Sequence, residues 1–152
     1  MIVYRIARQR YARDLSGTGA RLYGGRWNGK GVALLYTAES RALAAMELAV
    51  RMDVNDLPRD LMLISIGLPP QATLQQVDPF QGWDQHPAGA ETQQRGNTFV
   101  TQGNDLLMRV PSVVIKGDYH ILVNPQHPQF HQVNIEDVVP FFFDERLSSG
   151  PG

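Results

Sequence analysis

The sequence feature that most restricts the fold is a glycine-rich stretch from Gly17 to Gly31, which runs directly into the apolar segment Val32–Ala38. Six of the fifteen residues in this stretch are glycine, and arginine, tyrosine, tryptophan and asparagine stand among them. Glycine allows positive φ angles and a close approach of the backbone to a ligand. Together with arginine and aromatic side chains, it suits a loop that grips a flat, charged molecule. The stretch therefore predicts a ligand-binding loop that the rest of the chain frames.

The remaining pattern favours an α+β domain, because strands and helices do not alternate regularly. Apolar and β-branched runs predict strands at residues 2–7, 32–37, 61–68, 106–110, 113–115, 119–123 and 138–143. Helical spacing of apolar residues predicts a helix over 40–52, with Ser40 as its N-cap. A second helix is expected over 88–102, where Gly96 and Asn97 weaken the pattern. The loop segments are 9–31 and 71–87.

Composition excludes several classes of protein. The 152 residues are expected to form one domain over 1–147, followed by a flexible tail at 148–152. The net charge is −1 and no basic run is present, so direct nucleic-acid binding is not expected. The lack of cysteine excludes disulfides and thiol catalysis. No signal peptide and no stretch of roughly 20 apolar residues is found, so we expect a soluble, cytoplasmic protein with no membrane partner.

The glycine-rich stretch is not a nucleotide-binding motif of a common kind. Gly24 and Gly29-Lys30 have the spacing of a P-loop, but Gly31 stands where a serine or threonine must reach Mg²⁺. Gly17-Thr-Gly19 lacks the third glycine of a dinucleotide fingerprint. Both alternatives are therefore rejected.

Two further patterns are weaker. His127 and His131 are four residues apart, but Pro125 and Pro128 disfavour the helix that would place them together as metal ligands. Ser112 follows Pro111 without the glycines of a nucleophile elbow. We expect no metal site, and a hydrogen-bonding or structural serine.

Glu47 lies at the edge of the apolar stripe of the first predicted helix. The spacing favours a surface ion pair with Arg51, four residues later, because such pairs are common and individually weak. The alternative is a carboxylate that faces a cleft. The spacing alone does not decide between them.

Six short segments, taken together, resemble the RES domain, the toxin half of a bacterial toxin-antitoxin pair. They are Gly24–Asn28, Tyr36–Ser40, Ala42–Glu47, Val110–Ser112, Asn124–Pro128 and Phe143–Leu147. They occur in order within a match from Tyr4 to Leu147, and Gly-Gly-Arg-Trp-Asn followed by the strand tyrosine and the helix glutamate is the most specific part. One departure is His120, where the pattern leads us to expect an asparagine.

The resemblance implies a fold similar to the diphtheria-toxin-type ADP-ribosyltransferases and the consumption of NAD⁺ as a substrate, with no cofactor besides it. It implies that Arg26, Tyr36 and Glu47 are catalytic, and that the substrate-binding residues are Ser112, Asn28, Arg5 and Asn124. In this reading Glu47 stabilises an oxocarbenium-like centre on the ribose. Arg26 holds the pyrophosphate and Tyr36 stacks on nicotinamide.

The resemblance also implies a partner, a small Xre-type antitoxin that covers the mouth of the Gly17–Gly31 loop. Cleavage of the nicotinamide-ribose bond by water or phosphate is the expected reaction. Transfer of ADP-ribose to a protein and a catalytically silent binding module are the alternatives. The joint presence of Arg26, Tyr36, Glu47 and Ser112 favours cleavage.

Overall fold

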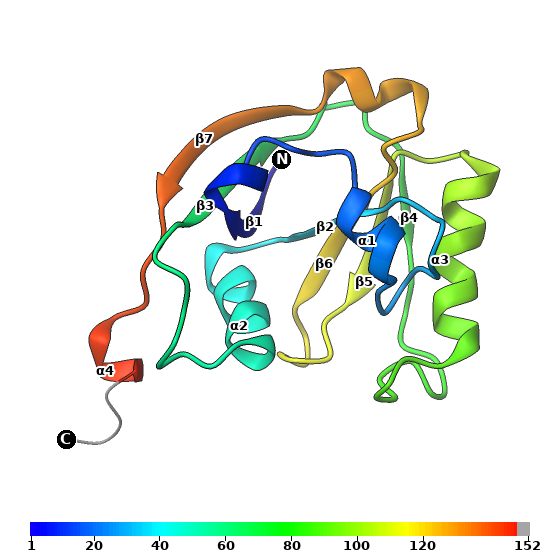
Figure 1. Cartoon of the computed structure of the whole chain (residues 1–152). Coiled ribbons are helices and arrows are strands. Elements are labelled where there is room, and N and C mark those ends of the chain that lie inside the picture. Colours follow the sequence, from blue (N-terminus) through cyan, green and yellow to red (C-terminus); the bar gives the residue numbers. More distant parts are fainter. Residues whose placement is uncertain (149–152) are drawn as a thin grey trace.

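A seven-stranded sheet organises the molecule, with the strand order β4-β5-β6-β2-β1-β3-β7 (Figure 1). The computed structural model describes residues 1–148. The strands are β1 (Ile2–Arg8), β2 (Leu35–Ala38), β3 (Leu61–Gly67), β4 (Leu74–Gln76), β5 (Leu107–Pro111), β6 (Tyr119–Val123) and β7 (Asn134–Pro140). The α-helices are α1 (Thr18–Tyr23), α2 (Arg41–Arg51), α3 (Ala90–Gln102) and α4 (Glu145–Ser148), and short 3-10 helices are η1 (Gln9–Tyr11) and η2 (Pro128–Gln132). The expected α+β class is confirmed.

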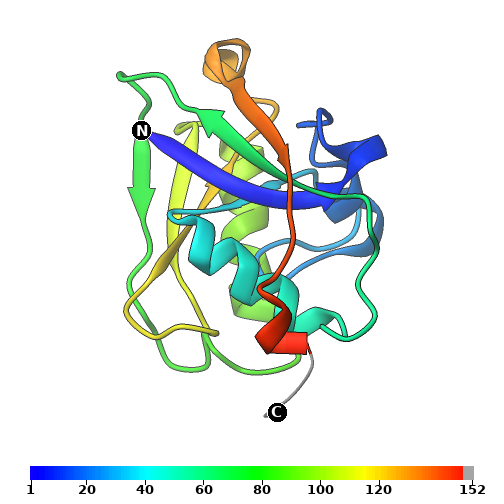
Figure 2. The same cartoon turned by 90° about the vertical axis from the view of Figure 1, so that its left-hand side faces the viewer.

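The sheet consists of two parts that meet at one registered pair. β1 and β3 are antiparallel and pair from Ile2↔Gly67 to Arg8↔Leu61, whereas β1 and β2 pair only at Tyr4↔Ala38. Figure 2 shows β1 running across the direction of β5 and β6. The side chains between the two parts form the largest apolar core, with members that include Val3, Ile64, Ile66, Leu35, Ile121 and Val123. This core fixes the angle between the two parts.

The other face of β2, β5 and β6 is covered by α3 and by the glycine-rich loop. Trp27 from the loop and Leu34 from the segment that follows it pack with Phe99 of α3, Met108 of β5 and Leu122 of β6. Successive side chains of a strand point to opposite faces, so this second core is separate from the first. The loop is thus pressed between a helix and a sheet.

Helix α2 packs at the junction of the two sheet parts. Leu43 and Ala44 contact Ala38 of β2, and Tyr4 and Ile6 of β1 pack against the same cluster. The Ser40 side chain accepts a hydrogen bond from Leu43 N at 3.0 Å, which confirms the predicted N-cap. The cap and the apolar stripe therefore place α2 directly beside the single β1–β2 contact.

Several local predictions were wrong. The segment 9–31 contains η1 and α1, and 71–87 contains β4. Residues 113–115 form a turn, because the Ser112 hydroxyl accepts from Ile115 N at 3.1 Å and closes the chain on itself. The last strand ends at Pro140 instead of residue 143. The bounds of β4 and β7 depend on pairing with β5 and β3, which local sequence does not encode.

Of the tail expected at 148–152, residues 149–152 lie outside the described part of the chain. Within residues 1–148, none of the helices has the length and apolar character needed to cross a membrane.

Candidate active site

A tight turn at the tip of the glycine-rich loop presents Arg26. Gly25 N donates a hydrogen bond to Asn28 O at 3.0 Å, so Arg26 and Trp27 form the bend between them. Gly24 precedes the bend with a φ of 75°, a conformation that L side chains rarely adopt. Trp27 is buried and meets the Phe80 ring edge-on, with the ring centroids 6.2 Å apart. Burial of the tryptophan therefore anchors the arginine beside it.

Asn28 holds this turn from inside. Its Nδ2 donates to Ala20 O at 2.8 Å, Val32 O at 3.0 Å and Gly29 O at 3.1 Å. Its Oδ1 accepts from the Tyr36 hydroxyl at 2.6 Å. The side chain is fully buried and uses both ends of the amide. Asn28 is therefore the centre of the loop's hydrogen-bond network.

Tyr36 of β2 completes the network. Its hydroxyl oxygen accepts from Trp27 N at 2.9 Å, and a Cβ atom at Gly25 would lie 2.6 Å from that oxygen. Burial raises the pKa of Tyr36, and this outweighs the opposing effects of the Trp27 N–H and the Arg26 charge. The hydroxyl stays protonated and donates to Asn28. Glycine at position 25 is thus required for the turn to lie over the phenol.

One face of α3 fixes the loop from the outside, which the sequence analysis missed. Gln93 Nε2 donates to Gly25 O at 3.0 Å, and Asn97 Oδ1 accepts from Gly29 N at 2.9 Å. A Cβ atom at Gly96 would lie 1.5 Å from Trp27 O, so only glycine permits this approach. Gln93, Gly96 and Asn97 have the spacing of one helix face, and that spacing was the available signal.

The Arg26 guanidinium is held by the segment 83–85. Its Nη1 donates to Gln85 O at 2.7 Å and to Trp83 O at 3.2 Å. Lys116 braces the same segment, with an ion pair to Asp84 at 2.8 Å and its ammonium 4.6 Å from the centre of the Trp83 ring. Both of these hydrogen bonds of Arg26 use Nη1. The guanidinium is therefore oriented by two backbone carbonyls.

Glu47 of α2 meets His120 of β6 instead of Arg51. Glu47 Oε1 lies 2.8 Å from His120 Nε2, with the two side chains 27% and 16% exposed. Arg51 Nε donates to the backbone O of Glu47 at 3.2 Å, so the interpretation as a surface ion pair was wrong. The carboxylate lies on the inward side of the helix.

The charges around Glu47 keep it ionised. Burial raises the pKa of the carboxyl, but the hydrogen bond from His120 and then the His120 charge lower it. Arg51 and Arg26 lower it further, and the result is a pKa below the ordinary value for glutamate. Since the Arg26 charge acts on Glu47 and on Tyr36, these three predicted catalytic residues share one electrostatic environment.

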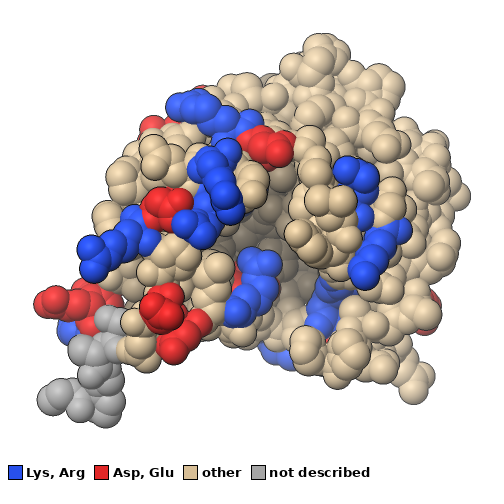
Figure 3. Space-filling model, viewed as in Figure 1, with Lys and Arg blue, Asp and Glu red and all other residues tan. Residues whose placement is uncertain are grey.

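The space-filling view shows a hollow between the side that carries α2 and the side that carries α1 and α3 (Figure 3). Lysine and arginine side chains gather along its rim, although the chain as a whole has a net charge of −1. Glu47 and Arg26 belong to elements on its two sides. An anion that entered between them would find local positive charge.

Two further predicted site residues, Ser112 and Asn124, form hydrogen bonds with backbone groups. Ser112 and Asn124 are fully buried. The Ser112 hydroxyl is bonded to Ile115 N, and the Asn124 amide donates to Val100 O at 3.3 Å and accepts from Gln126 N at 2.9 Å. Their substrate contacts stay predictions, and their visible role is to shape the chain next to β5 and β6.

Arg5 is also separated from the other predicted site residues. It lies on the face of β1 opposite to Tyr4 and Ile6, and its Nη1 donates to Asp14 O at 2.7 Å. Burial lowers the pKa of Arg5, and the Asp14 charge offsets part of this. Arg5 therefore binds the segment ahead of α1, and its role towards substrate stays a prediction.

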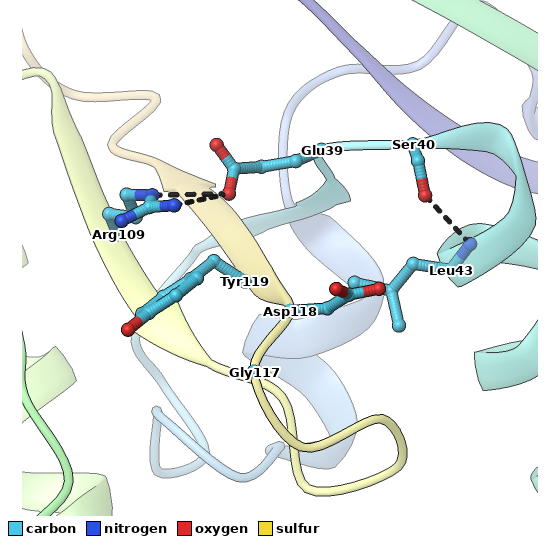
Figure 4. Close-up of a pocket in the computed structure, with 7 residues that line it drawn as sticks. All are labelled: Glu39, Ser40, Leu43, Arg109, Gly117, Asp118 and Tyr119. Carbon is cyan, nitrogen blue, oxygen red and sulfur yellow. Dashed lines mark hydrogen bonds and ion pairs between the residues drawn. The ribbon is translucent and has the colours of Figure 1, made fainter.

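A separate hollow of about 200 Å³ lies at the ends of β5 and β6 (Figure 4). Arg109 there pairs with Glu39 at 2.9 Å and lies 3.7 Å from the centre of the Tyr119 ring. Arg109 follows Met108 and Tyr119 precedes His120, so both point to the opposite face of these strands from the candidate site. Arg109 and Glu39 there are paired with each other, and we do not assign the chemistry to this hollow.

Comparison with known proteins identifies the family. The RES domain model matches residues 2–144. The Prs ADP-ribosylating toxin of a Sphingobium species is 36% identical over 93% of this chain and 91% of its own length. Toxin Res of Photorhabdus laumondii is 32% identical over 97% of both chains, and Toxin Res of Pseudomonas putida is 36% identical over 97% of this chain and 99% of its own.

A solved structure has the same fold. A chain of the crystal structure of the M. tuberculosis MbcT-MbcA toxin-antitoxin complex superposes with a TM-score of 0.75, over 93% of this chain and 84% of that one. Its sequence identity is 19%, so the likeness concerns the fold. With the sequence relatives and the family model in agreement, the chain belongs to the RES domain family.

Proposed function

We propose that this chain is the toxin of a toxin-antitoxin pair and that it cleaves the nicotinamide-ribose bond of NAD⁺, with water or phosphate as the acceptor. The observation that carries the proposal is the common environment of Glu47, Arg26 and Tyr36 across the hollow. The names of the relatives, which include an ADP-ribosylating toxin, support the same class of chemistry.

The role of Glu47 follows from the charge that develops during cleavage. As the bond breaks, its electron pair leaves with the nicotinamide nitrogen, and positive charge develops on the ribose C1′ and ring oxygen. A carboxylate that is already ionised and fixed in place stabilises this charge without reorganisation. The lowered pKa of Glu47 keeps the carboxylate charged at neutral pH. When water is the acceptor, its oxygen bonds to C1′ and its proton passes to the solvent. When phosphate is the acceptor, an ionised phosphate oxygen bonds to C1′.

Arg26 and Tyr36 bind the rest of the substrate in this scheme. Nη1 of Arg26 is used by two backbone carbonyls, which leaves Nε and Nη2 as donors for the pyrophosphate oxygens. The Tyr36 hydroxyl is engaged by Asn28 and Trp27. The ring is thereby held in one orientation, in which it can stack on nicotinamide.

Transfer of ADP-ribose to a protein is the second candidate. It is favoured by one specific observation, the 36% identity to a relative named as an ADP-ribosylating toxin. The same bond breaks and the same residues act, and only the nucleophile differs. The two candidates therefore share the roles of Glu47, Arg26 and Tyr36.

The direct test is to incubate the purified protein with NAD⁺ in the presence and absence of phosphate, and to identify the products. Water gives ADP-ribose, and phosphate gives the 1″-phosphate of ADP-ribose. A bacterial lysate with labelled NAD⁺ reveals transfer to a protein. The matched control is Glu47→Gln, which we expect to be folded and inactive. If NAD⁺ stays intact under all three conditions while the protein is folded, the proposal is wrong.

The partner that we propose is a small Xre-type antitoxin that covers the mouth of the Gly17–Gly31 loop and blocks entry of NAD⁺. The fold neighbour comes from a toxin-antitoxin complex. On this chain, Leu22 and Tyr23 at the end of α1 are 50% and 80% exposed and offer apolar contact area. We expect Tyr23→Glu to weaken the complex, whereas Val50→Glu on the exposed side of α2 serves as the control. A complex that still cleaves NAD⁺ would rule out blocking.

A further inference from the structure

Both ring nitrogens of His120 face hydrogen-bond acceptors. Nδ1 lies 3.1 Å from the backbone O of Thr37, and Nε2 lies 2.8 Å from Glu47 Oε1. His120 belongs to β6, where it pairs with Ala38 of β2 and Val110 of β5, so the ring stands on a rigid part of the sheet. Its side chain is 16% exposed, which limits competition from water.

The acceptors determine where the protons lie. A backbone carbonyl oxygen can only accept, so Nδ1 must carry a hydrogen. An ionised carboxylate can also only accept, so Nε2 must carry a hydrogen as well. The contact between His120 and Glu47 therefore contains a proton that joins the two side chains. If that proton is removed, a nitrogen lone pair faces a carboxylate oxygen and the contact becomes repulsive.

We propose that His120 is a positioning residue for Glu47 and that it acts through this proton. The inference rests on the proposed function, in which Glu47 stabilises the charged ribose. The bond to Oε1 fixes the carboxylate on the inward side of α2 and leaves Oε2 available for the ribose. Without this hydrogen bond the carboxylate can turn away from the ribose, and turnover falls.

Other charges also act on Glu47. Arg51, on the same helix, and Arg26, from the loop, are the further groups whose charge reaches Glu47 among the described residues. Arginine remains protonated across the pH range in which enzymes are assayed. Tyr36 on β2 has its pKa raised by burial and stays neutral. Among the described residues, the hydrogen bond to Glu47 Oε1 comes from His120.

Two variants separate the proton from the shape of the side chain. In His120→Gln the amide nitrogen takes the place of Nε2, so it donates to Glu47 but does not titrate. In His120→Asn, the residue that the family pattern leads us to expect, the shorter amide reaches only the place of Nδ1 and Thr37 O. The first keeps the contact with Glu47, and the second loses it.

The first measurement is kcat and KM for NAD⁺ cleavage by the two variants. We expect His120→Gln to keep kcat near the wild-type value, because its amide still donates to Glu47. We expect His120→Asn to lower kcat by roughly tenfold to a hundredfold, with KM nearly unchanged, because a misplaced carboxylate costs about that much. A loss of kcat in His120→Gln as large as that in His120→Asn, or wild-type kcat in His120→Asn, would overturn the proposal.

The second measurement does not depend on activity. Nitrogen-15 NMR of the ring of His120, assigned by comparison with His120→Gln, should show hydrogens on both nitrogens. Glu47→Gln should alter the Nε2 signal and leave the other three histidines unchanged. A bare Nε2 overturns the proposal even if NAD⁺ is cleaved. Two ring protons in a protein that leaves NAD⁺ intact would instead refute the proposed function alone.

Discussion

The two sides of the hollow hold their functional groups in different ways. On the loop side, residues 24–36, the buried Asn28 amide and the Tyr36 hydroxyl make five hydrogen bonds, all to neutral groups. On the helix side, the Glu47 carboxylate is held by one contact, with the His120 ring. The loop side is thus fixed by several hydrogen bonds at once, and the helix side by one.

This difference assigns separate tasks to the two sides. Many neutral bonds in a buried network fix geometry, because breaking any one of them leaves an unpaired polar group. A single charged contact fixes the position of a side chain less firmly than a network does. It nevertheless places negative charge where the reaction needs it. Substitutions within the hydrogen-bond network of Asn28 and Tyr36 should therefore act mainly on stability, and those at Glu47 on turnover.

The largest expected effect is that of Glu47→Gln. The amide preserves the shape of the side chain but removes the negative charge, so turnover should fall by about a thousandfold. The melting temperature should barely change, as measured by calorimetry. Arg51→Ala is the control, since its contact is with the backbone of Glu47 and its effect should be small. Near-wild-type NAD⁺ cleavage by folded Glu47→Gln protein would refute the catalytic assignment.

Tyr36→Phe, on the loop side, should lower stability more than activity, which is the opposite of Glu47→Gln. Removal of the hydroxyl leaves Asn28 Oδ1 without its donor and Trp27 N without its acceptor. Two buried groups left unpaired should lower the free energy of unfolding by about 3 kcal/mol. The ring remains for stacking, so the variant should retain part of its activity below its melting transition. Unchanged stability in chemical denaturation would show that the network is not rigid.

Gly96→Ala tests the contact of α3 with the loop side. The added Cβ would overlap Trp27 O, so the loop must shift, and we expect a loss of about 2 kcal/mol in stability. Gly19→Ala is the matched control, because a Cβ there has no atom within 4 Å. That control should be neutral or slightly stabilising. Equal changes in stability for the two variants would show that the close approach of α3 to the loop does not contribute to stability.

The smallest of these effects belongs to Arg26→Lys, which changes binding on the loop side without disturbing its network. Lysine keeps the charge but loses the planar fork that can hold two phosphate oxygens. We expect kcat/KM to fall by about tenfold, which corresponds to the loss of one good contact. Unfolding by denaturant should differ little from the wild type. Wild-type kinetics in Arg26→Lys would remove the bidentate clamp from the mechanism.

The sequence allowed prediction of those features that depend on neighbouring residues. The Ser40 cap and the apolar stripe of α2 are local signals, and both agree with the structure. The α+β class followed from the same kind of pattern. Local signals did not give β4 or the strand order, since these depend on pairing between distant segments.

The candidate site was predictable in part. Arg26, Tyr36 and Glu47 came from the family resemblance. The partner of Glu47 did not, because spacing along a helix favours Arg51 while His120 lies 73 residues away. Gly96 was taken as a weakness of α3, although it is the point at which the loop backbone approaches the helix. The glycine within the predicted helix therefore indicated a close contact between that helix and another backbone segment.

The strand order also determines the stage of synthesis at which the site can form. β2 enters the sheet through β6, from Leu35↔Val123 to Ala38↔His120, and it meets β1 at a single registered pair. During synthesis, Glu47 leaves the ribosome long before His120, and the strand that carries His120 must pair with β2 before the two side chains meet. Contacts between such distant segments form slowly, since a long loop must close first. A nascent chain shorter than about four fifths of the protein therefore lacks the Glu47–His120 contact.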